Sequence, residues 1–527
     1  MTAEKIEIPE KRRTNPWRAW RRVRQALQIV IFALFVYLLM ESWRTGLTGE
    51  LTNLYLRLNP LAALASMAAA RAWIPAMGLA LATVGLTVLL SRFWCGWLCP
   101  LGSLLDWIRP ADRRMGEGRP IWRTVKYALL FAILVMAAFG SLWLLVLDPI
   151  TLLTRALVTS VLPGINYAIT SAEISLYSVS FMRPVINWLE STLRGVVLPS
   201  TQPVFLMNLL FFLLLGGVVA LNWVADRFWC RYLCPLGGLL GLLAKVSIFK
   251  PLIGEHCNQC GRCERVCRMD AIEPPAAETD HQTIIASECV LCLDCFADCP
   301  QRSINLGLQP TLPASTQFDP GRREVLGALA FGAAGVSLLR ANQRSQNPDP
   351  FLIRPPGVRD EEEFISQCIR CGECMQVCPT SALQPALFQG GPEGLWTPYL
   401  VPRSGYCDFS CNACGQVCPT GAIPPLDLET KRQEVIGLAV IDRSRCLPWA
   451  FATPCIVCEE MCPIPDKAIR VEEVTTINDY GEEVFLQQPY VLRELCIGCG
   501  ICEQYCPMEA RSAIQVQRRQ GLDLPIF

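Results

Sequence analysis

Residues 289–300 read Cys-Val-Leu-Cys-Leu-Asp-Cys-Phe-Ala-Asp-Cys-Pro, a Cys-x2-Cys-x2-Cys-x3-Cys-Pro sequence. This spacing, or a looser form of it, recurs in six groups of four, which leaves only four of the 28 cysteines outside them. The groups are Cys257, Cys260, Cys263 and Cys267; Cys289, Cys292, Cys295 and Cys299; Cys368, Cys371, Cys374 and Cys378; Cys407, Cys411, Cys414 and Cys418; Cys446, Cys455, Cys458 and Cys462; and Cys496, Cys499, Cys502 and Cys506.

The spacing favours iron–sulfur clusters over other cysteine chemistry. Three thiolates on a tight loop can reach one cubane, and the fourth, on a following helical turn, ligates the other cluster in two-cluster ferredoxins. Proline follows the fourth cysteine in five groups, whereas Arg268 takes its place in the first. Disulfide frameworks suit small secreted chains, and zinc sites use paired Cys-x2-Cys sequences. We therefore predict six [4Fe-4S] clusters.

Cluster pairing follows from adjacency only in the first two groups. One cluster is expected on Cys257, Cys260, Cys263 and Cys299, and its partner on Cys267, Cys289, Cys292 and Cys295. For the last four groups, consecutive pairing and nested pairing, first with last, both remain open.

Four apolar stretches predict a membrane domain. Hydrophobic residues make up 52% of the chain, and about 20 apolar residues are needed to cross a bilayer. The stretches lie at approximately 25–40, 73–91, 125–147 and 204–224. Basic residues concentrate before the first stretch and after the second and fourth, which places the N-terminus in the cytoplasm. Core helices of a soluble protein are the rival interpretation.

The four remaining cysteines lie in a repeated sequence. Residues 92–102 read Arg-Phe-Trp-Cys-Gly-Trp-Leu-Cys-Pro-Leu-Gly, and residues 227–237 read Arg-Phe-Trp-Cys-Arg-Tyr-Leu-Cys-Pro-Leu-Gly. A spacing of four places two side chains on the same face of a helix. The sequence predicts either a shared metal or dithiol site or cysteines that only pack beside interfacial aromatic residues. The cysteines are Cys95, Cys99, Cys230 and Cys234.

A second targeting signal is predicted in mid-chain. Arg322 and Arg323 precede a short apolar stretch within residues 319–339, a pattern typical of a twin-arginine signal. Its length fits a signal better than a membrane span, and we expect it to stay as an anchor. The rival is a linker helix on the cytoplasmic membrane surface. Export would place four clusters outside and leave two in the cytoplasm.

Composition excludes other cofactors and partners. The two histidines, His256 and His281, lie outside the apolar stretches, and no Cys-x-x-Cys-His occurs, so we expect no haem. The net charge is zero, and we expect no nucleic-acid partner.

Together these motifs resemble a fusion of two known partners. Residues 1–310 resemble the NapH/MauN type of membrane ferredoxin, and residues 320–527 resemble the NapG/MauM type of four-cluster ferredoxin. The flavin-threonine motif of the more distant NosR-like proteins is missing, so no covalent flavin is expected. The resemblance implies membrane helices with α+β bacterial-ferredoxin-like domains. The expected domains are 1–245 in the membrane, 246–310 as a cytoplasmic two-cluster domain, 311–360 as anchor and linker, and 361–527 as a periplasmic four-cluster domain.

The resemblance also implies function. We expect an inner-membrane protein that takes electrons from the quinone pool and passes them to a periplasmic reductase, such as nitrate reductase, or to its cytochrome. The alternative is a maturation factor that supplies electrons, or copper or thiol reduction, to another enzyme such as methylamine dehydrogenase. Asp148 could accept a quinol proton, although its place before Pro149 also fits a helix cap.

Overall fold

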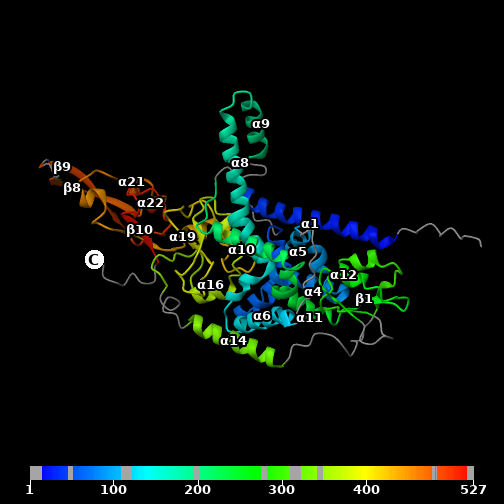
Figure 1. Cartoon of the computed structure of the whole chain (residues 1–527). Coiled ribbons are helices and arrows are strands. Elements are labelled where there is room, and N and C mark those ends of the chain that lie inside the picture. Colours follow the sequence, from blue (N-terminus) through cyan, green and yellow to red (C-terminus); the bar gives the residue numbers. More distant parts are fainter. Residues whose placement is uncertain are drawn as a thin grey trace, which may run out of the picture. The chain divides into compact units, whose positions relative to one another are not determined.

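The structure is a computed structural model that describes residues 15–45, 51–108, 121–194, 202–274, 282–308, 322–340, 348–477, 481 and 483–518 (Figure 1). The chain divides into two compact units, each of which combines apolar helices with a cysteine-rich segment. The first comprises residues 1–35, 81–127 and 219–320, and the second comprises residues 36–80, 128–218 and 321–527. The boundary falls within helices α1, α6 and α10, and after the first residue of α4.

The first unit contains both Cys-Pro turns. Each is a short π-helix that ends at its second cysteine, where proline starts an α-helix. In chain order its helical segments are the first part of α1 (Pro16–Thr45), α4 (Ala80–Leu90), η2 (Trp94–Leu98), α5 (Pro100–Trp107), the start of α6 (Ile121–Ala138), η5 (Leu221–Trp223), η6 (Trp229–Leu233) and α11 (Pro235–Ala244).

The ferredoxin segment of this unit is α+β. Two antiparallel pairs join β1 to β4, with Phe249 opposite Leu308, and β2 to β3, with Ile272 opposite Ile284. Its elements are β1 (Phe249–Ile253), α12 (Arg262–Val266), β2 (Ile272–Glu273), β3 (Thr283–Ile284), α13 (Asp294–Asp298) and β4 (Ile304–Leu308). Phe296 and Ile304 form its core with Trp97 from the first Cys-Pro turn, so turn and ferredoxin share one core.

The second unit carries the other helices before its cysteine-rich segment. They are the rest of α1, α6 and α10 (Asn208–Ala220), then α2 (Leu54–Arg57), α3 (Pro60–Ala70), η1 (Pro75–Leu79), η3 (Trp143–Leu147), α7 (Pro149–Ala156), η4 (Leu157–Val161), α8 (Leu162–Tyr177) and α9 (Arg183–Leu193). Figure 1 shows α8 and α9 as a helical hairpin. Helix α14 (Arg322–Arg340) covers most of the predicted twin-arginine segment.

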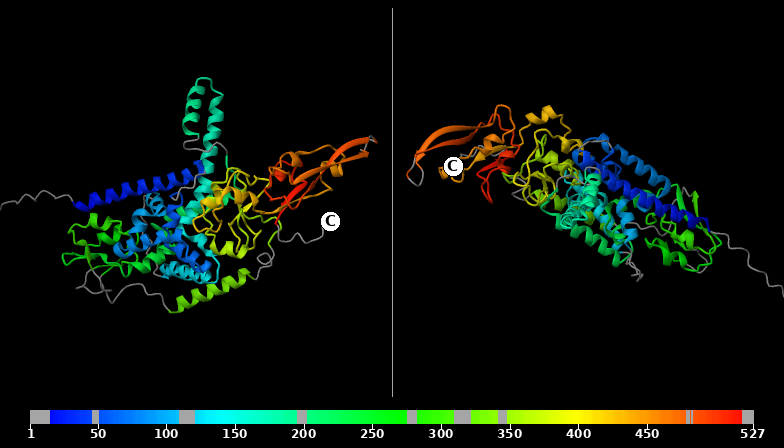
Figure 2. Two further views of the ribbon diagram at one scale, coloured as in Figure 1. Left: turned by 180° about the vertical axis from the view of Figure 1, so that it is seen from behind. Right: turned by 90° about the horizontal axis from the view of Figure 1, so that it is seen from above.

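The cysteine-rich part of the second unit combines short helices with three antiparallel strand pairs: β5 with β6, β7 with β10, and β8 with β9. Figure 2 shows β8 and β9 as a long hairpin at one end of this segment. The elements are α16 (Glu361–Gln367), α17 (Glu373–Gln376), β5 (Leu383–Pro385), β6 (Pro398–Leu400), α18 (Ala413–Gln416), α19 (Leu428–Gln433), β7 (Leu438–Ile441), α20 (Leu447–Ala450), α21 (Val457–Glu460), β8 (Ile469–Ile477), β9 (Glu483–Val491), α22 (Ile501–Gln504) and β10 (Ile514–Gln517).

The apolar helices differ from the predicted spans. Among the described residues, two helical runs are long and apolar enough to cross a membrane, Pro16–Ser42 and Pro149–Tyr177. The first contains the predicted stretch 25–40. The second lies outside the four predicted stretches, because its polar Thr, Ser and Asn residues interrupt the apolar pattern. The other three predicted stretches form shorter helices, so the number four stays a prediction.

Candidate iron–sulfur sites and the Cys-Pro turns

The second cysteine group of the first unit lines a cavity together with the last cysteine of the first group. Its walls include Cys267, Cys289, Cys292 and Cys295. Burial raises the pKa of Cys295, and the neighbouring thiols of Cys292, Cys289 and Cys267 raise it further. This arrangement agrees with the exchange of fourth cysteines that the spacing predicts.

The complementary set is less enclosed. Burial raises the pKa of Cys263 to about 11, with a further contribution from Cys257. Cys299 packs against the same core as Cys263, while Cys260 is exposed. Cys257 and Cys263 are therefore neighbours, and the assignment of Cys299 to this set stays a prediction.

In the second unit the third and fourth groups exchange their last cysteines. Burial and the thiols of the same group raise the pKa of Cys374, and so does Cys418 from the fourth group. Reciprocally, the pKa of Cys414 is raised by burial, by Cys407 and by Cys378 from the third group. The third and fourth groups thus form a consecutive pair.

The fifth and sixth groups form the second consecutive pair. A cavity is lined by Cys446, Cys455 and Cys458 together with Cys506 from the sixth group. Burial, then Cys496 and Cys407, and then Cys462 from the fifth group raise the pKa of Cys499. The geometry therefore favours consecutive over nested pairing, a choice that spacing left open.

The two pairs are joined by their cysteine loops. The backbone N–H of Cys407 donates to the carbonyl of Cys499 at 2.8 Å. The sets that contain these two cysteines are therefore neighbours, and the four sets follow one another in a row. Its ends are the set of Cys368 and the set of Cys446.

The Cys368 end of this row packs on the apolar helices of the same unit. Gln376 Nε2 donates to the Leu39 carbonyl at 2.6 Å, and Arg370 Nη1 donates to the Leu142 carbonyl at 2.9 Å. The backbone carbonyl of Arg370 accepts from Arg155 Nη1 at 3.1 Å, and the guanidinium of Arg155 lies over the Trp396 ring. This end of the row is thus fixed to helical residues by buried side chains.

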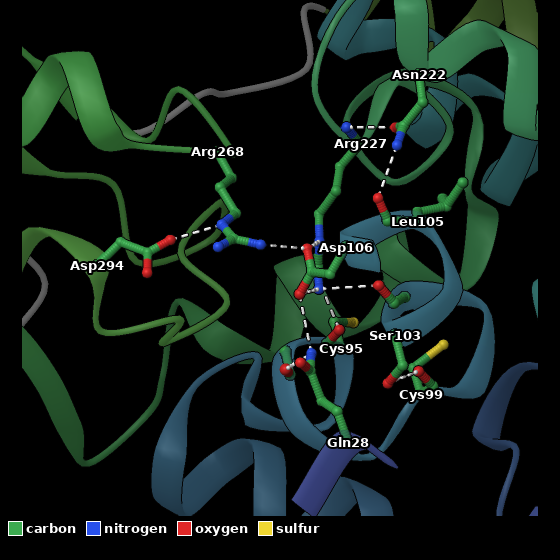
Figure 3. Close-up of polar contacts among 12 residues, drawn as sticks. Gln28, Cys95, Cys99, Ser103, Leu105, Asp106, Asn222, Arg227, Arg268 and Asp294 are labelled. Atoms are coloured by element: carbon green, nitrogen blue, oxygen red, sulfur yellow. Dashed lines mark hydrogen bonds and ion pairs between the residues drawn. The ribbon is translucent and has the colours of Figure 1, made fainter. Parts of the chain in front are cut away.

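In the first unit, Asp106 holds the first Cys-Pro turn in place (Figure 3). Arg227 donates through Nε to Oδ1 at 2.7 Å and through Nη2 to Oδ2 at 2.8 Å. Arg24 Nη1 and Gln28 Nε2 donate to Oδ2 at 3.0 and 2.9 Å. Burial would raise the pKa of Asp106, but Arg227, Arg268 and Arg24 hold it well below its usual range.

Arg268, which replaces the usual proline, links the ferredoxin to this network. Its Nη1 lies 3.0 Å from Asp106 Oδ1, and its Nε donates to Asp294 Oδ2 at 2.5 Å. A proline at this position would supply neither contact. The departure from the ferredoxin pattern therefore has a structural role, which the spacing alone did not indicate.

Glu288 is the counterpart of Asp106: Asp106 pairs with Arg227, which opens the second turn, and Glu288 pairs with Arg92, which opens the first. It pairs with Arg92 Nη1 at 3.3 Å and with Lys126 Nζ at 2.5 Å, and Tyr127 donates to its other oxygen at 3.2 Å. Gly241 occupies the position that corresponds to Asp106, and a Cβ there would lie 2.9 Å from the Ser287 carbonyl. The sequence patterns did not single out Asp106 or Glu288. The signal for Asp106 was a lone carboxylate in an apolar segment after the first Cys-Pro turn, and the signal for Glu288 was a carboxylate directly before Cys289.

The four turn cysteines are buried in the same unit. Burial raises the pKa of Cys99, with Cys95 and then Cys230 of the other turn contributing further. Among the described residues, no group of three or more His, Cys, Asp or Glu side chains is placed to hold a single metal ion. In a cubane each thiolate binds its own iron, so the four sulfurs surround the cluster and do not converge on one ion.

Asp148 is a helix cap. Its Oδ2 accepts from the backbone N–H groups of Ile150 at 3.1 Å and Thr151 at 2.9 Å, and from Asn59 Nδ2 at 2.7 Å. Its buried Oδ1 has no hydrogen-bond partner in the described part of the chain.

Family comparisons identify iron–sulfur binding in several segments. A "4Fe-4S binding domain" matches residues 72–116 and 207–254, a "4Fe-4S dicluster domain" matches 367–422, and another "4Fe-4S binding domain" matches 489–512. No solved structure matches the chain.

Curated relatives agree with these domains. The "methylamine utilization ferredoxin-type protein MauM" of Methylorubrum extorquens is 36% identical over 208 residues, 38% of this chain and 90% of the relative. The "ferredoxin-type protein NapG" of Escherichia coli is 35% identical over 37% of this chain and 85% of the relative. The "putative electron transport protein YccM" of Escherichia coli is 27% identical over 55% of this chain and 76% of the relative. Such relatives support an iron–sulfur electron-transfer role, and through its ferredoxin-type part the chain belongs to the MauM/NapG family of ferredoxin-type proteins.

Proposed function

We propose that this protein is a membrane-bound quinol-oxidising module that passes electrons through six [4Fe-4S] clusters to a periplasmic reductase. The single observation that carries the proposal is the row of four cysteine sets in the second unit, fixed at its Cys368 end to apolar helices through Gln376 and Arg370. Each cluster, when bound, supplies one-electron transfer. A row that starts at helices and continues away from them suits electrons taken from a lipid-soluble donor.

The proposal includes four membrane spans, a cytoplasmic N-terminus and an exported C-terminal segment. Basic flanks and the Arg322-Arg323 sequence support this topology. The likeness to NapG and MauM supports a periplasmic redox partner.

Oxidation of quinol to quinone releases two electrons and two protons, so a proton acceptor is needed beside the first cluster set. We assign this role to Asp148, whose buried Oδ1 has no hydrogen-bond partner in the described residues. A cluster held by the Cys368 set would accept the two electrons one at a time, and the second proton would go to water.

The test is reduction of the purified, anaerobic full chain by a short-chain quinol, followed by EPR. The iron–sulfur signals should appear with quinol and with dithionite. Asp148→Asn should keep the helix cap, since Asn caps as well as Asp, and should slow quinol-dependent reduction about tenfold while dithionite reduction is unchanged. Equal quinol rates in both proteins would remove Asp148 from the mechanism.

A protein that dithionite reduces but quinol does not would overturn quinol oxidation and favour the maturation role. The 36% identity to MauM, a methylamine utilization protein, is the observation that supports this second candidate. In that case, deletion of the gene should leave a partner enzyme without its cofactor, whereas an electron-transfer module should leave the partner's cofactor intact.

A further inference from the structure

The two Cys-Pro turns are copies in backbone as well as in sequence. Each π-helix is closed by a hydrogen bond from the second cysteine's N–H, from Cys99 to Trp94 and from Cys234 to Trp229, both at 2.9 Å. Cys99 has φ −72° and ψ 118°, and Cys234 has φ −73° and ψ 108°. Single-turn π-helices occur frequently at functional sites.

The arginine that opens each copy lies against the other copy. Arg227, which opens the second copy, donates to the carbonyls of Cys95 at 3.1 Å and Gly102 at 3.2 Å in the first. Arg92, which opens the first, approaches Gly237 of the second so closely that a Cβ there would lie 2.8 Å from Nη2. The turns therefore face each other across a pseudo-twofold contact that brings both cysteine pairs together.

The four thiols are enclosed. Their residues are only 5–8% exposed. The thiols of Cys230, Cys95 and Cys99 all lie close enough to Cys234 to interact with it electrostatically. The backbone N–H of Gly237 donates to Cys234 Sγ at 3.2 Å.

The indole N–H groups of two equivalent tryptophans, one in each copy, are buried without hydrogen-bond acceptors in the described residues, and so are two nitrogens of Arg92. Trp94 Nε1, Trp229 Nε1 and two nitrogens of Arg92 have no hydrogen-bond partner in the described residues. Leaving a buried donor unpaired costs about 1–3 kcal/mol, more for a charged group. The guanidinium of Arg92 lies close enough to Cys95 and Cys234 to interact with their sulfurs, and its unpaired N–H groups suit an anionic group that carries acceptors of its own.

The nearest cysteine loop of the ferredoxin lies against this site. Trp97 Nε1 donates to the Leu291 carbonyl at 2.9 Å, and a Cβ on Gly96 would lie 2.0 Å from the Val290 carbonyl. Val290 and Leu291 stand between Cys289 and Cys292, so a group held by the turns would be close enough to exchange electrons with the cluster of that loop.

We propose that Cys95, Cys99, Cys230 and Cys234 together ligate a seventh iron–sulfur cluster, most simply a [4Fe-4S] cubane, between the two Cys-Pro turns. When bound, the cluster would have its negative charge offset by the guanidiniums of Arg92 and Arg227, and its sulfides would offer acceptors to the unpaired nitrogens of Arg92. The "4Fe-4S binding domain" matches at 72–116 and 207–254 contain these four cysteines and none of the six quartets. The proposal stands whether or not quinol is the electron donor.

The experiment is iron and acid-labile sulfide counting on anaerobically purified full chain, with Mössbauer spectroscopy. The wild type should hold about 28 irons, and the double variant Cys95→Ala/Cys230→Ala about 24, because each cubane contains four. The EPR signals of the remaining clusters should persist in the variant and report that it is folded. About 26 irons in the wild type would mean that the four turn cysteines hold a [2Fe-2S] cluster in place of a cubane.

A measurement on the unaltered protein guards against a variant that fails to fold. Native mass spectrometry of the wild type should show seven cubanes per chain. About 24 irons in wild type and variant alike would overturn the proposal. Stoichiometric zinc or copper on these four cysteines, or a Cys95–Cys230 type disulfide recovered by peptide mapping, would overturn it as well.

Discussion

At the residue scale, a few buried charges attach the first ferredoxin segment to the Cys-Pro turns. Asp106 receives three guanidiniums, from Arg24, Arg227 and Arg268. Buried charges are tolerated only when paired, and removing one partner of a buried pair is strongly destabilising because the other charge is left uncompensated. These side chains therefore serve mainly to position the ferredoxin segment against the Cys-Pro turns, and they add little to the net stability of the fold.

We expect Arg268→Ala to lower the free energy of unfolding by about 3 kcal/mol, the low end for a broken buried pair. Asp106 keeps two guanidiniums, whereas Asp294 loses its ion pair with Arg268. Thermal melting in detergent measures the change. Arg262→Ala, which changes an exposed arginine on the helix α12 that precedes Arg268, is the matched control and should leave the melting temperature unchanged. Equal melting of both variants would contradict the role assigned to Arg268.

Asp106→Asn should destabilise the protein by a margin that is constant between pH 8 and pH 5. The pKa of Asp106 is held well below its usual range, so its stabilisation is complete above the unfolded value of about 3.9 and is lost only as the pH falls below that value. Melting temperatures of wild type and variant across this range check it. A difference that shrinks from pH 8 to pH 5 would show that the carboxyl titrates there.

At the element scale, the first Cys-Pro turn and the second cysteine loop are in backbone contact at Gly96. No side chain fits there, because an added Cβ would lie 2.0 Å from the Val290 carbonyl, a rigid backbone atom. The corresponding residue of the other copy is Arg231, which instead pairs with Asp270 at 3.0 Å. The two copies thus use the same turn for different contacts.

Gly96→Ala should therefore destabilise the first unit by about 1–3 kcal/mol, the usual cost of overpacking, and loosen the Cys289–Cys299 loop. Iron retention during mild chelator challenge, followed together with thermal melting, measures both effects. Gly85→Ala in α4 is the control, since a Cβ there meets nothing within 4 Å and alanine favours a helix by about 1 kcal/mol. Unchanged iron retention in Gly96→Ala would contradict the close contact.

At the scale of the whole molecule, each unit joins apolar helices to its own cysteine-rich segment. In the second unit the cluster sets follow one another in consecutive pairs, joined by the hydrogen bond from Cys407 to Cys499. A linear row suits electron transfer in single steps between neighbours.

Consecutive pairing predicts that Cys378 and Cys407 serve one cluster. The variants Cys378→Ala and Cys407→Ala should each lose about four irons, and the double variant should lose the same four, because one cubane has four irons. Nested pairing would assign the two cysteines to different clusters, so the double variant would then lose about eight. Iron counting on anaerobic protein decides between them.

The proposed topology predicts an external C-terminus. An epitope tag fused after residue 527 should be digested when protease is added to intact spheroplasts. Lysine substitution of Arg322 and Arg323 together should leave the tag protected, because this arginine pair is the proposed export signal. A tag that stays protected in the unaltered fusion, while a periplasmic control protein is digested, would return the four-cluster segment to the cytoplasm.

The sequence by itself determined the chemistry. Cysteine spacing alone predicted cluster-binding groups and the exchange of Cys267 with the second group, because ligand geometry around a cubane is local to a loop and one helical turn. It also singled out the Cys-Pro turns, since a repeat of eleven residues is visible without any structure.

Only the tertiary structure decided how these parts are joined. Pairing among the last four groups, the contact of Gly96 with Val290, the reciprocal arginines and the role of Arg268 all depend on residues far apart in the chain. The helical run Pro149–Tyr177 was also missed, because a buried helix keeps polar residues that a hydropathy pattern counts against it. Local spacing specifies ligands, whereas the charges and close contacts that position them are long-range and are fixed only when the chain folds.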